Sequence, residues 1–160
     1  DCLKETAATT AMIFAIVFGA LVFANFITLT GLTNQLVEWI QGSGFSVTGV
    51  LLAMVLIYLV LGALMEAMGL LLLTAPIFTA VAVDMGVNPV WFGIFVVMMI
   101  EVGMLTPPVG MNVFTVKTLL PEVKLSTIFR GVMPFVVANL VAVGLLIAWP
   151  DIALVSLRWF

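Results

Sequence analysis

Long apolar runs separated by short polar stretches dominate this chain. Four runs are predicted to cross a bilayer, which takes about 20 apolar residues in helix, and they cover about 7–29, 46–61, 89–120 and 128–149. Between the first two runs, residues 32–41 place apolar side chains on one helical face and polar side chains on the other, with Trp39 as an interfacial residue. This pattern predicts a short helix in the membrane surface, with a polar loop as the alternative.

The apolar stretch over 64–86 is interrupted at its centre by Thr74-Ala-Pro76. Each arm has about 8–10 residues, which at about 1.5 Å per helical residue reaches only half a bilayer. We therefore predict a re-entrant helical hairpin over 64–86 with its tip at Thr74-Ala-Pro76. A single tilted and kinked helix is the alternative.

The third run, 89–120, contains a segment that a helix tolerates poorly, Thr106-Pro-Pro-Val-Gly110. Its two prolines have no N–H, so the carbonyls of Gly103 and Met104 lose their helical partners. Broken backbone at membrane depth is tolerated where it is buried in protein or lines a cavity. We predict a broken helix whose first half ends in carbonyls that suit a cation and whose second half starts with N–H groups that suit an anion. A kink that only shapes packing is the alternative.

Composition supports a membrane protein and excludes several chemistries. Of the 160 residues, 64% are hydrophobic and 8% are charged, whereas a soluble domain carries roughly 25% charged residues. The apolar runs are far longer than barrel strands, so we predict an all-α protein. The net charge of −3, without a basic patch, gives no sign of a nucleic-acid partner. The absence of histidine and the single cysteine, Cys2, remove histidine-dependent catalysis, thiolate metal sites and internal disulfides, so no enzyme is expected.

The predicted organisation has three parts. Residues 1–44 hold the first span and the surface helix, residues 45–120 hold a span, the hairpin and the broken helix of a transport unit, and residues 121–160 hold a cytoplasmic loop, the last span and a C-terminal tail. Three basic residues flank the loop 120–127 and two lie near the termini, namely Lys117, Lys124 and Arg130, and Lys4 and Arg158. The positive-inside rule then predicts that loops 31–45 and 120–127 are cytoplasmic and that both termini are outside. The N-terminal residues show neither an initiating Met nor a signal peptide, and we expect the chain to begin within a longer protein.

Three segments carry a family resemblance: Leu72-Leu-Thr-Ala-Pro-Ile-Phe78, Gly86-Val-Asn-Pro-Val-Trp-Phe-Gly93 and Gly103-Met-Leu-Thr-Pro-Pro-Val-Gly-Met-Asn-Val-Phe114. They resemble the C-terminal part of the large membrane subunit of TRAP transporters, the tripartite ATP-independent periplasmic transporters for organic acids. The resemblance extends through Pro134, and the Thr-Pro-Pro-Val-Gly segment with Trp-Phe-Gly upstream is its specific part. One departure is Glu66, where such subunits usually carry Asp.

The resemblance implies the second inverted repeat of an elevator-type transporter of the ion transporter superfamily. It implies Na⁺-coupled uptake of a carboxylate that a periplasmic binding protein delivers to the bacterial inner membrane. The partners it implies are the first repeat of the large subunit, a small membrane subunit and membrane lipid, with no cofactor beyond the coupling ion. A passive channel and an accessory structural subunit are the alternatives.

We assign three roles around the two predicted breaks. The Na⁺ ligands are carbonyl and hydroxyl oxygens of Thr74, Gly103, Met104, Thr106 and Pro107. The substrate carboxylate is expected near the half-helices that start at Pro76 and Val109, beside Gly110, Asn112 and Thr115. Structural support of the break is assigned to Glu101 and Pro108, with Glu101 accepting hydrogen bonds from freed backbone N–H groups or a hydroxyl.

Overall fold

The computed structural model describes residues 2–107 and 110–155. This part of the chain is helical throughout and contains no strand. Its helices are α1 (Cys2–Thr30), α2 (Leu32–Gly42), α3 (Val47–Leu64), α4 (Ala67–Asp84), α5 (Pro89–Leu105), α6 (Met111–Leu119), α7 (Leu125–Ala148) and α8 (Asp151–Leu154). In these residues α1, α3, α4 and α7 are long and apolar enough to cross a membrane, while α5 is apolar but shorter.

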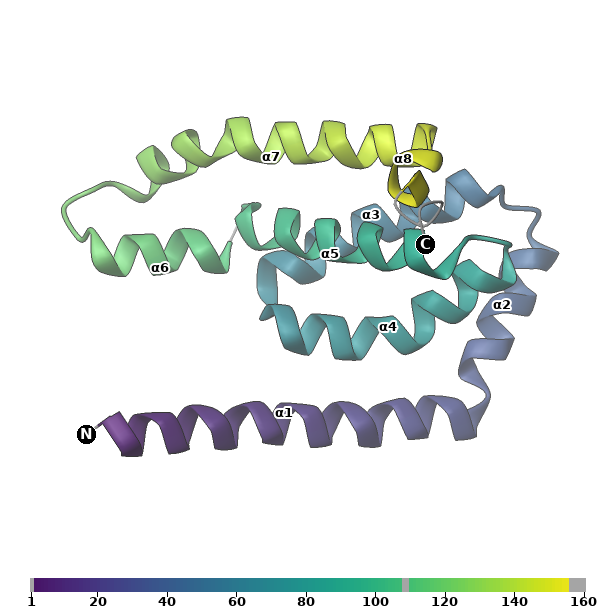
Figure 1. The fold of residues 1–160 in the computed structure, drawn as a ribbon, viewed down its shortest axis with the longest axis horizontal. Helices are drawn as coiled ribbons and strands as arrows, with labels where there is room; N and C mark the ends of the chain where they lie inside the picture. Colours follow the sequence, from purple (N-terminus) through teal and green to yellow (C-terminus); the bar gives the residue numbers. More distant parts are fainter. Residues whose placement is uncertain (1, 108–109, 156–160) are drawn as a thin grey trace.

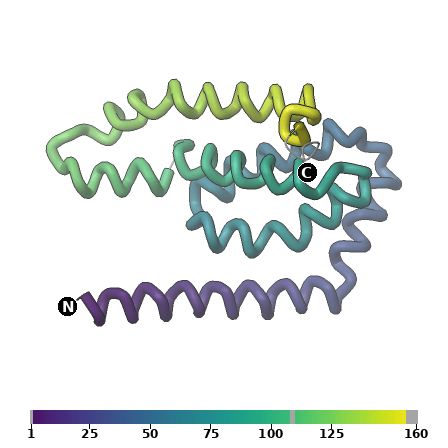
Figure 2. Tube along the Cα trace, viewed as in Figure 1, coloured from purple at the N-terminus to yellow at the C-terminus, as the bar shows by residue number. Residues whose placement is uncertain are grey.

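The helices lie roughly along one long axis (Figure 1). Helices α1 and α7 each run along most of this axis, and α5 and α6 together do the same. The α3–α4 pair is different, because α3 turns back into α4 part-way along the axis, beside the point where α5 gives way to α6. The tube view in Figure 2 shows the same arrangement of turn and break. The break predicted within 89–120 is therefore confirmed.

The predicted hairpin over 64–86 is wrong in its position. Helix α4 is continuous from Ala67 to Asp84, with Pro76 inside it, so Thr74-Ala-Pro76 is not a tip. The Thr74 hydroxyl donates to the Leu70 carbonyl of its own helix at 2.8 Å, and a lone proline withdraws only one backbone donor. The helical hairpin instead consists of α3 and α4, joined at Met65 and Glu66, where the backbone is extended.

This shift also overturns the predicted placement of the loops. Because the α3–α4 hairpin enters and leaves at the same end of the long axis, only α5 and α6 separate loop 31–45 from loop 120–127. Those two loops consequently lie at opposite ends, and the N-terminal end of α1 lies at the same end as the α6–α7 loop, away from α8 (Figure 1). The prediction that both loops share one side and both termini the other is wrong.

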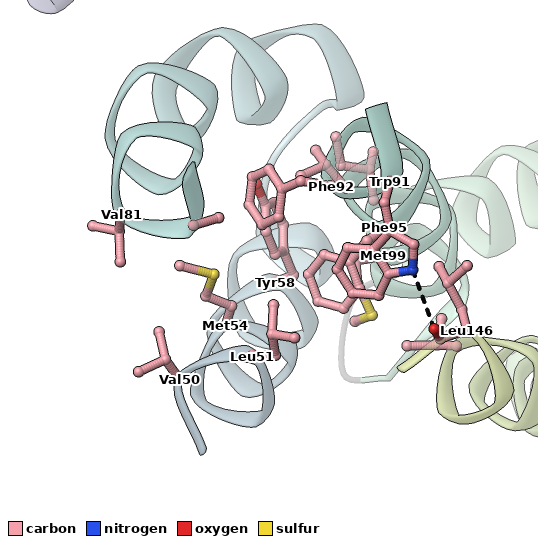
Figure 3. Close-up of a cluster of buried hydrophobic side chains, with 14 of the residues drawn as sticks. Val50, Leu51, Met54, Tyr58, Val81, Trp91, Phe92, Phe95, Met99 and Leu146 are labelled. Carbon is pink, nitrogen blue, oxygen red and sulfur yellow. Dashed lines mark hydrogen bonds between the residues drawn. The ribbon is translucent and has the colours of Figure 1, made fainter. Parts of the chain in front are cut away.

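The core lies where α5 packs against α3, α4 and α7 (Figure 3). Its largest fully buried side chains include Tyr58, Phe92, Phe95 and Met99. The Trp91 ring stacks on Phe95, and its Nε1–H donates to the Leu146 carbonyl at 3.1 Å. Such aromatic packing with a satisfied indole N–H holds α5 between the hairpin and α7.

Helix α2 joins α1 to the hairpin. It covers Leu32–Gly42, as the surface-helix pattern predicts, and it turns away from the long axis (Figure 1). Gln41 near its end donates from its side-chain amide to the carboxylate of Asp84, the last residue of α4. The start and the end of the hairpin are thereby linked to the same short helix.

Candidate functional site

The α5–α6 break is shaped by its prolines and by one glycine. At the end of α5, the Thr106 N–H donates to the Gly103 carbonyl at 3.1 Å, and the Thr106 hydroxyl donates to the Val102 carbonyl at 2.6 Å. Pro107 has no N–H to continue the helix. The chain re-enters helix at Gly110, whose φ of +59° is left-handed and suits glycine. These features end one helix and start the next within a few residues.

The hairpin turn lies directly against this break. The Gly110 N–H donates to the Ala63 carbonyl, at the end of α3, with a distance of 3.3 Å. Beside it, Gly62 and Gly103 bring α3 and α5 into backbone contact: a Cβ placed on Gly103 would lie 2.7 Å from the Gly62 Cα. Small residues at such a crossing let membrane helices approach closely. Two interruptions of helix, separated by about 40 residues of sequence, therefore meet at one place.

Backbone oxygens converge beside Gly110. A Cβ on this glycine would lie 3.3 Å from the Thr106 carbonyl oxygen and 3.4 Å from that of Met104. Thr106 and Met104 are half-buried and Pro107 is exposed. Across residues 2–107 and 110–155, no three acidic, cysteine or histidine side chains come together as a metal site. The oxygen atoms that lie beside Gly110 are the neutral backbone carbonyls of Met104 and Thr106.

Thr74 does not lie at this place. It follows the N-cap of α4 by eight residues, which is roughly 12 Å along a helix at 1.5 Å per residue. Its buried hydroxyl is 2.9 Å from the Tyr58 hydroxyl and donates to the Leu70 carbonyl. The prediction that Thr74 and Thr106 sit at two neighbouring breaks is wrong, because the backbone at Thr74 is helical and its hydroxyl is engaged within the hairpin.

The N-terminus of α4 is already occupied by a carboxylate. Glu66 is its N-cap, and its two carboxylate oxygens accept hydrogen bonds from the N–H groups of Met68 and Gly69, each at 3.0 Å. The prediction that a half-helix starts at Pro76 is wrong, because Pro76 lies inside the continuous helix α4. The departure from the usual Asp at position 66 keeps the same capping chemistry with a longer side chain.

The N-terminus of α6 has a different character. Its N-cap is Gly110, which has no side chain to offer, and its first turn contains no acidic residue. Asn112 and Thr115 are exposed on one helical face, and the Thr115 hydroxyl donates to the Met111 carbonyl at 3.0 Å. Of the two helix starts at this place, only that of α6 is without a carboxylate of its own.

Glu101 is not placed to brace the break. It is exposed on α5, and it has no hydrogen bond or ion pair with the residues that the structure describes. At the end of α5, the backbone N–H and the hydroxyl of Thr106 donate to the carbonyls of Gly103 and Val102, not to Glu101. The roles assigned to Pro108 and Val109 fall outside the described residues.

Sequence reasoning missed the contribution of Gly62 and Ala63. The signal was present in Gly62-Ala-Leu-Met-Glu66-Ala-Met-Gly69, a stretch with two glycines and a carboxylate inside an apolar run. That pattern also fits a turn at the membrane surface. Only the packing of α3 on α5 distinguishes a surface turn from one that meets the break.

Taken with its spans, this arrangement defines a multi-pass helical membrane protein in which a hairpin turn meets a broken helix, which is typical of secondary transporters. The chain belongs to the family described as the DctM component of the tripartite ATP-independent periplasmic transporters, whose model matches residues 1–152. This is a family of transporter components, not of enzymes, and the resemblance found in the sequence is confirmed.

Curated relatives agree with this assignment. The chain is 30% identical over 157 residues to the C4-dicarboxylate TRAP transporter large permease protein DctM of Pseudomonas aeruginosa, covering 98% of this chain and 36% of that protein. It is 32% identical over 154 residues to the sialic acid TRAP transporter large permease protein SiaM of Vibrio cholerae, covering 96% and 36%. It is 30% identical over 136 residues to the isethionate TRAP transporter permease protein DctMQ of Oleidesulfovibrio alaskensis, covering 85% and 21%. The chain thus spans about a third or less of the length of these relatives.

Proposed function

We propose that this chain forms part of the large permease of a Na⁺-coupled TRAP transporter that takes up an organic acid. The observation that carries the proposal is the meeting of the α3–α4 turn with the α5–α6 break, joined by the hydrogen bond from Gly110 N–H to the Ala63 carbonyl. Secondary transporters bind coupling ions and substrates where helices are discontinuous. A passive channel or an accessory subunit would not require two interruptions at one place.

The proposed Na⁺ site uses the oxygens gathered at the break. The carbonyls of Met104 and Thr106 lie beside Gly110, and unwound backbone carbonyls are the usual ligands of Na⁺ in such transporters. Gly103 and Pro107 frame these ligands, and the Thr106 hydroxyl adds a further oxygen. In this proposed site, the segment that packs against the break is the end of α3, at Gly62 and Ala63, and not the segment around Thr74.

The proposed substrate site is the start of α6. The positive end of a helix dipole and its N–H groups favour an anion, and this helix start has no carboxylate of its own. Asn112 and Thr115 stand on its exposed face. The names of the relatives refer to a C4-dicarboxylate, sialic acid and isethionate, and all three are organic anions at neutral pH.

The orientation follows from the basic residues. Lys4 lies in the first turn of α1, Lys117 in the last turn of α6, Lys124 at the N-cap of α7 and Arg130 in its second turn. These element ends lie together at the end of the long axis that holds the N-terminus and the α6–α7 loop (Figure 1). The positive-inside rule then places this end in the cytoplasm and the open end of the hairpin in the periplasm. In the proposed elevator mechanism, the hairpin and the broken helix move together with bound ion and substrate. The proposed partners are the rest of the large permease, a small membrane subunit and a periplasmic binding protein at the inner membrane.

The test is Na⁺-dependent uptake by the complete transporter in liposomes. Thr106→Ala removes one ligand oxygen, which by analogy with one hydrogen bond is worth on the order of 1 kcal/mol. The Na⁺ concentration for half-maximal uptake should therefore rise several-fold, and Thr106→Ser should restore most of the affinity.

Thr118→Ala is the matched control, because its hydroxyl also donates to a backbone carbonyl, that of Thr115, but lies two turns into α6. Its Na⁺ dependence should equal that of the unmodified transporter. If Thr106→Ala and Thr118→Ala behave alike while both assemble normally, the ion does not bind at this break.

A further inference from the structure

Helix α5 carries one exposed stripe along its length. Val90, Ile94 and Val97 recur at helical spacing and are 46%, 37% and 60% exposed, and Glu101 is the next exposed residue of the stripe. Three apolar side chains followed by a carboxylate therefore share one face. This face is not covered by any helix that the structure describes.

Glu101 lies far from both ends of its transmembrane run. It is twelve residues after Pro89 and eighteen before Leu119, the limits of α5 and α6. A charge in the middle of a transmembrane run is costly if it faces lipid without a partner. Because it also has no partner among the residues described here, the carboxylate requires one from elsewhere.

A groove beside α7 continues towards the same point. An apolar hollow is lined by Ile94 and Met98 of α5 and by Ala142 and Leu145 of α7, and α8 contributes Ile152 and Ala153 to it. Glu101 follows Met98 by three residues on α5, and Asn139 precedes Ala142 by three residues on α7, so both continue the walls of the groove at helical spacing. The groove therefore has an apolar length and a polar end, the pattern of a seat for another membrane helix with one polar contact.

The charge identifies what must sit in this groove. The basic residues that the structure describes belong to element ends that lie together at one end of the long axis: Lys4 to the first turn of α1, Lys117 to the last turn of α6, Lys124 to the N-cap of α7 and Arg130 to its second turn (Figure 1). The described residues, in this chain or in a second copy of it, therefore offer no cation at mid-span. Lipid tails carry no charge, and an anionic substrate would be repelled by the carboxylate. Most of the length of the related permeases lies outside this chain.

We infer that the α5 face with Ile94, Val97 and Glu101 is an interface with a transmembrane helix from the part of the large permease that this chain does not span. That helix places the basic side chain of an Arg or Lys against the Glu101 carboxylate. The inference rests on family membership and on the geometry of α5, and it is independent of the proposed Na⁺ site.

The first test places nitroxide labels on the stripe in the complete transporter in liposomes. Ile94→Cys and Val97→Cys are labelled in a cysteine-free large permease, with the small, buried Ala82→Cys, only 2% exposed, as the reference for a packed site. Both stripe labels should be as inaccessible as the reference to dissolved oxygen, which concentrates in lipid, and to a water-soluble nickel chelate. Accessibility to oxygen alone would make the face lipid-exposed, accessibility to nickel would make it the wall of an aqueous pathway, and either result overturns the inference.

The second test addresses the charge. Glu101→Gln leaves a buried cation without its partner, so the melting temperature of the complete permease should fall by several degrees. Glu122→Gln, at an exposed loop position, removes the same charge and should leave the melting temperature unchanged. An unchanged melting temperature for Glu101→Gln would show that no cation opposes it. The labelling experiment keeps Glu101 intact, so it remains decisive if the Gln variant does not assemble, and neither readout depends on Na⁺-coupled uptake.

Discussion

Two proline-containing segments of this chain look alike in sequence and differ in structure. Thr74-Ala-Pro76 lies inside the continuous helix α4, whereas the Thr106-Pro-Pro segment follows the end of α5. In both, a threonine hydroxyl donates to the carbonyl four residues earlier. The hydroxyl is therefore not what separates a kink from a break.

The difference comes from how many donors are lost and from what the chain meets afterwards. Pro76 withdraws a single N–H from α4, while Pro107 and Pro108 withdraw two in succession. Gly110 then adopts a left-handed φ and donates to Ala63 on another helix. Two adjacent missing donors, a glycine that can reverse the chain and a partner across the packing together end a helix inside a membrane.

The largest expected effect is at the crossing that holds the break against the hairpin. In Gly103→Ala, the new Cβ would lie 2.7 Å from the Gly62 Cα and 2.8 Å from the Tyr58 carbonyl oxygen. Since both neighbours are backbone atoms, α3 and α5 must separate, and overpacking of this kind costs about 1–3 kcal/mol. The melting temperature of the complete transporter should fall and Na⁺-dependent uptake should be lost.

Gly131→Ala on α7 provides the matched control, because nothing lies within 4 Å of its added Cβ. It should melt at or slightly above the temperature of the unmodified protein, since alanine favours helix. Equal melting temperatures for the two variants would mean that α3 and α5 do not meet at these glycines.

The next effect distinguishes the two threonines. Thr74→Val removes the hydrogen-bond partner of the Tyr58 hydroxyl, which is fully buried in the hairpin. Leaving that group unsatisfied should cost about 1–3 kcal/mol, measured as a lower melting temperature, and Thr74→Ser should recover most of it. The Na⁺ concentration for half-maximal uptake should stay constant in Thr74→Val. A several-fold rise in it would return Thr74 to the ion site.

The sequence was sufficient for the elements whose signal is local. The apolar runs predicted helices α1, α3 and α7, although the run 46–61 forms one arm of the hairpin and not a separate span. The amphipathic pattern predicted α2, and the two adjacent prolines predicted the break after Leu105. The position of the hairpin turn could not be predicted in this way. Met65 and Glu66 form a turn that lacks proline and carries only a carboxylate as its mark, while Thr74-Ala-Pro76 carries a stronger but misleading local signal.

The packing around the candidate site could not be predicted from the sequence for a related reason. Glu101 is a charge within an apolar run, which by itself indicates function. Whether its side chain faces the protein core or an open surface depends on which face of α5 the hairpin and α7 leave uncovered. Gly62 and Gly103 are about 40 residues apart, and their contact depends on the crossing of two helices. Tertiary contacts of this kind have no periodic signature in a single sequence.

A smaller effect is expected from substitutions of Glu66, which distinguishes the N-terminus of α4 from that of α6. Glu66→Ala removes the N-cap of α4, whose carboxylate accepts from the Met68 and Gly69 N–H groups, and loss of a cap costs about 1 kcal/mol. Glu66→Asp should keep the cap and the melting temperature. In Glu66→Ala the N–H groups at the start of α4 lose their carboxylate and become as open as those of α6. Anionic substrate should then also bind at the start of α4, in competition with binding at α6. The substrate concentration for half-maximal uptake should therefore rise. Identical melting temperatures for the Ala and Asp variants would contradict the capping role.

The smallest expected effect tests the comparison of the two prolines directly. Pro76→Ala restores one N–H to a helix that is already continuous, and the additional backbone hydrogen bond is worth about 0.5–1.5 kcal/mol. The melting temperature of the complete transporter should therefore stay the same or rise slightly, and Na⁺-dependent uptake should be preserved. Pro107→Ala, in contrast, returns a donor to the end of α5 and should alter the Na⁺ dependence, because it competes for the Gly103 carbonyl that now accepts from Thr106. Loss of uptake in a stable Pro76→Ala variant, with Pro107→Ala unaffected, would reverse the assignment and make residues 74–76 the functional interruption.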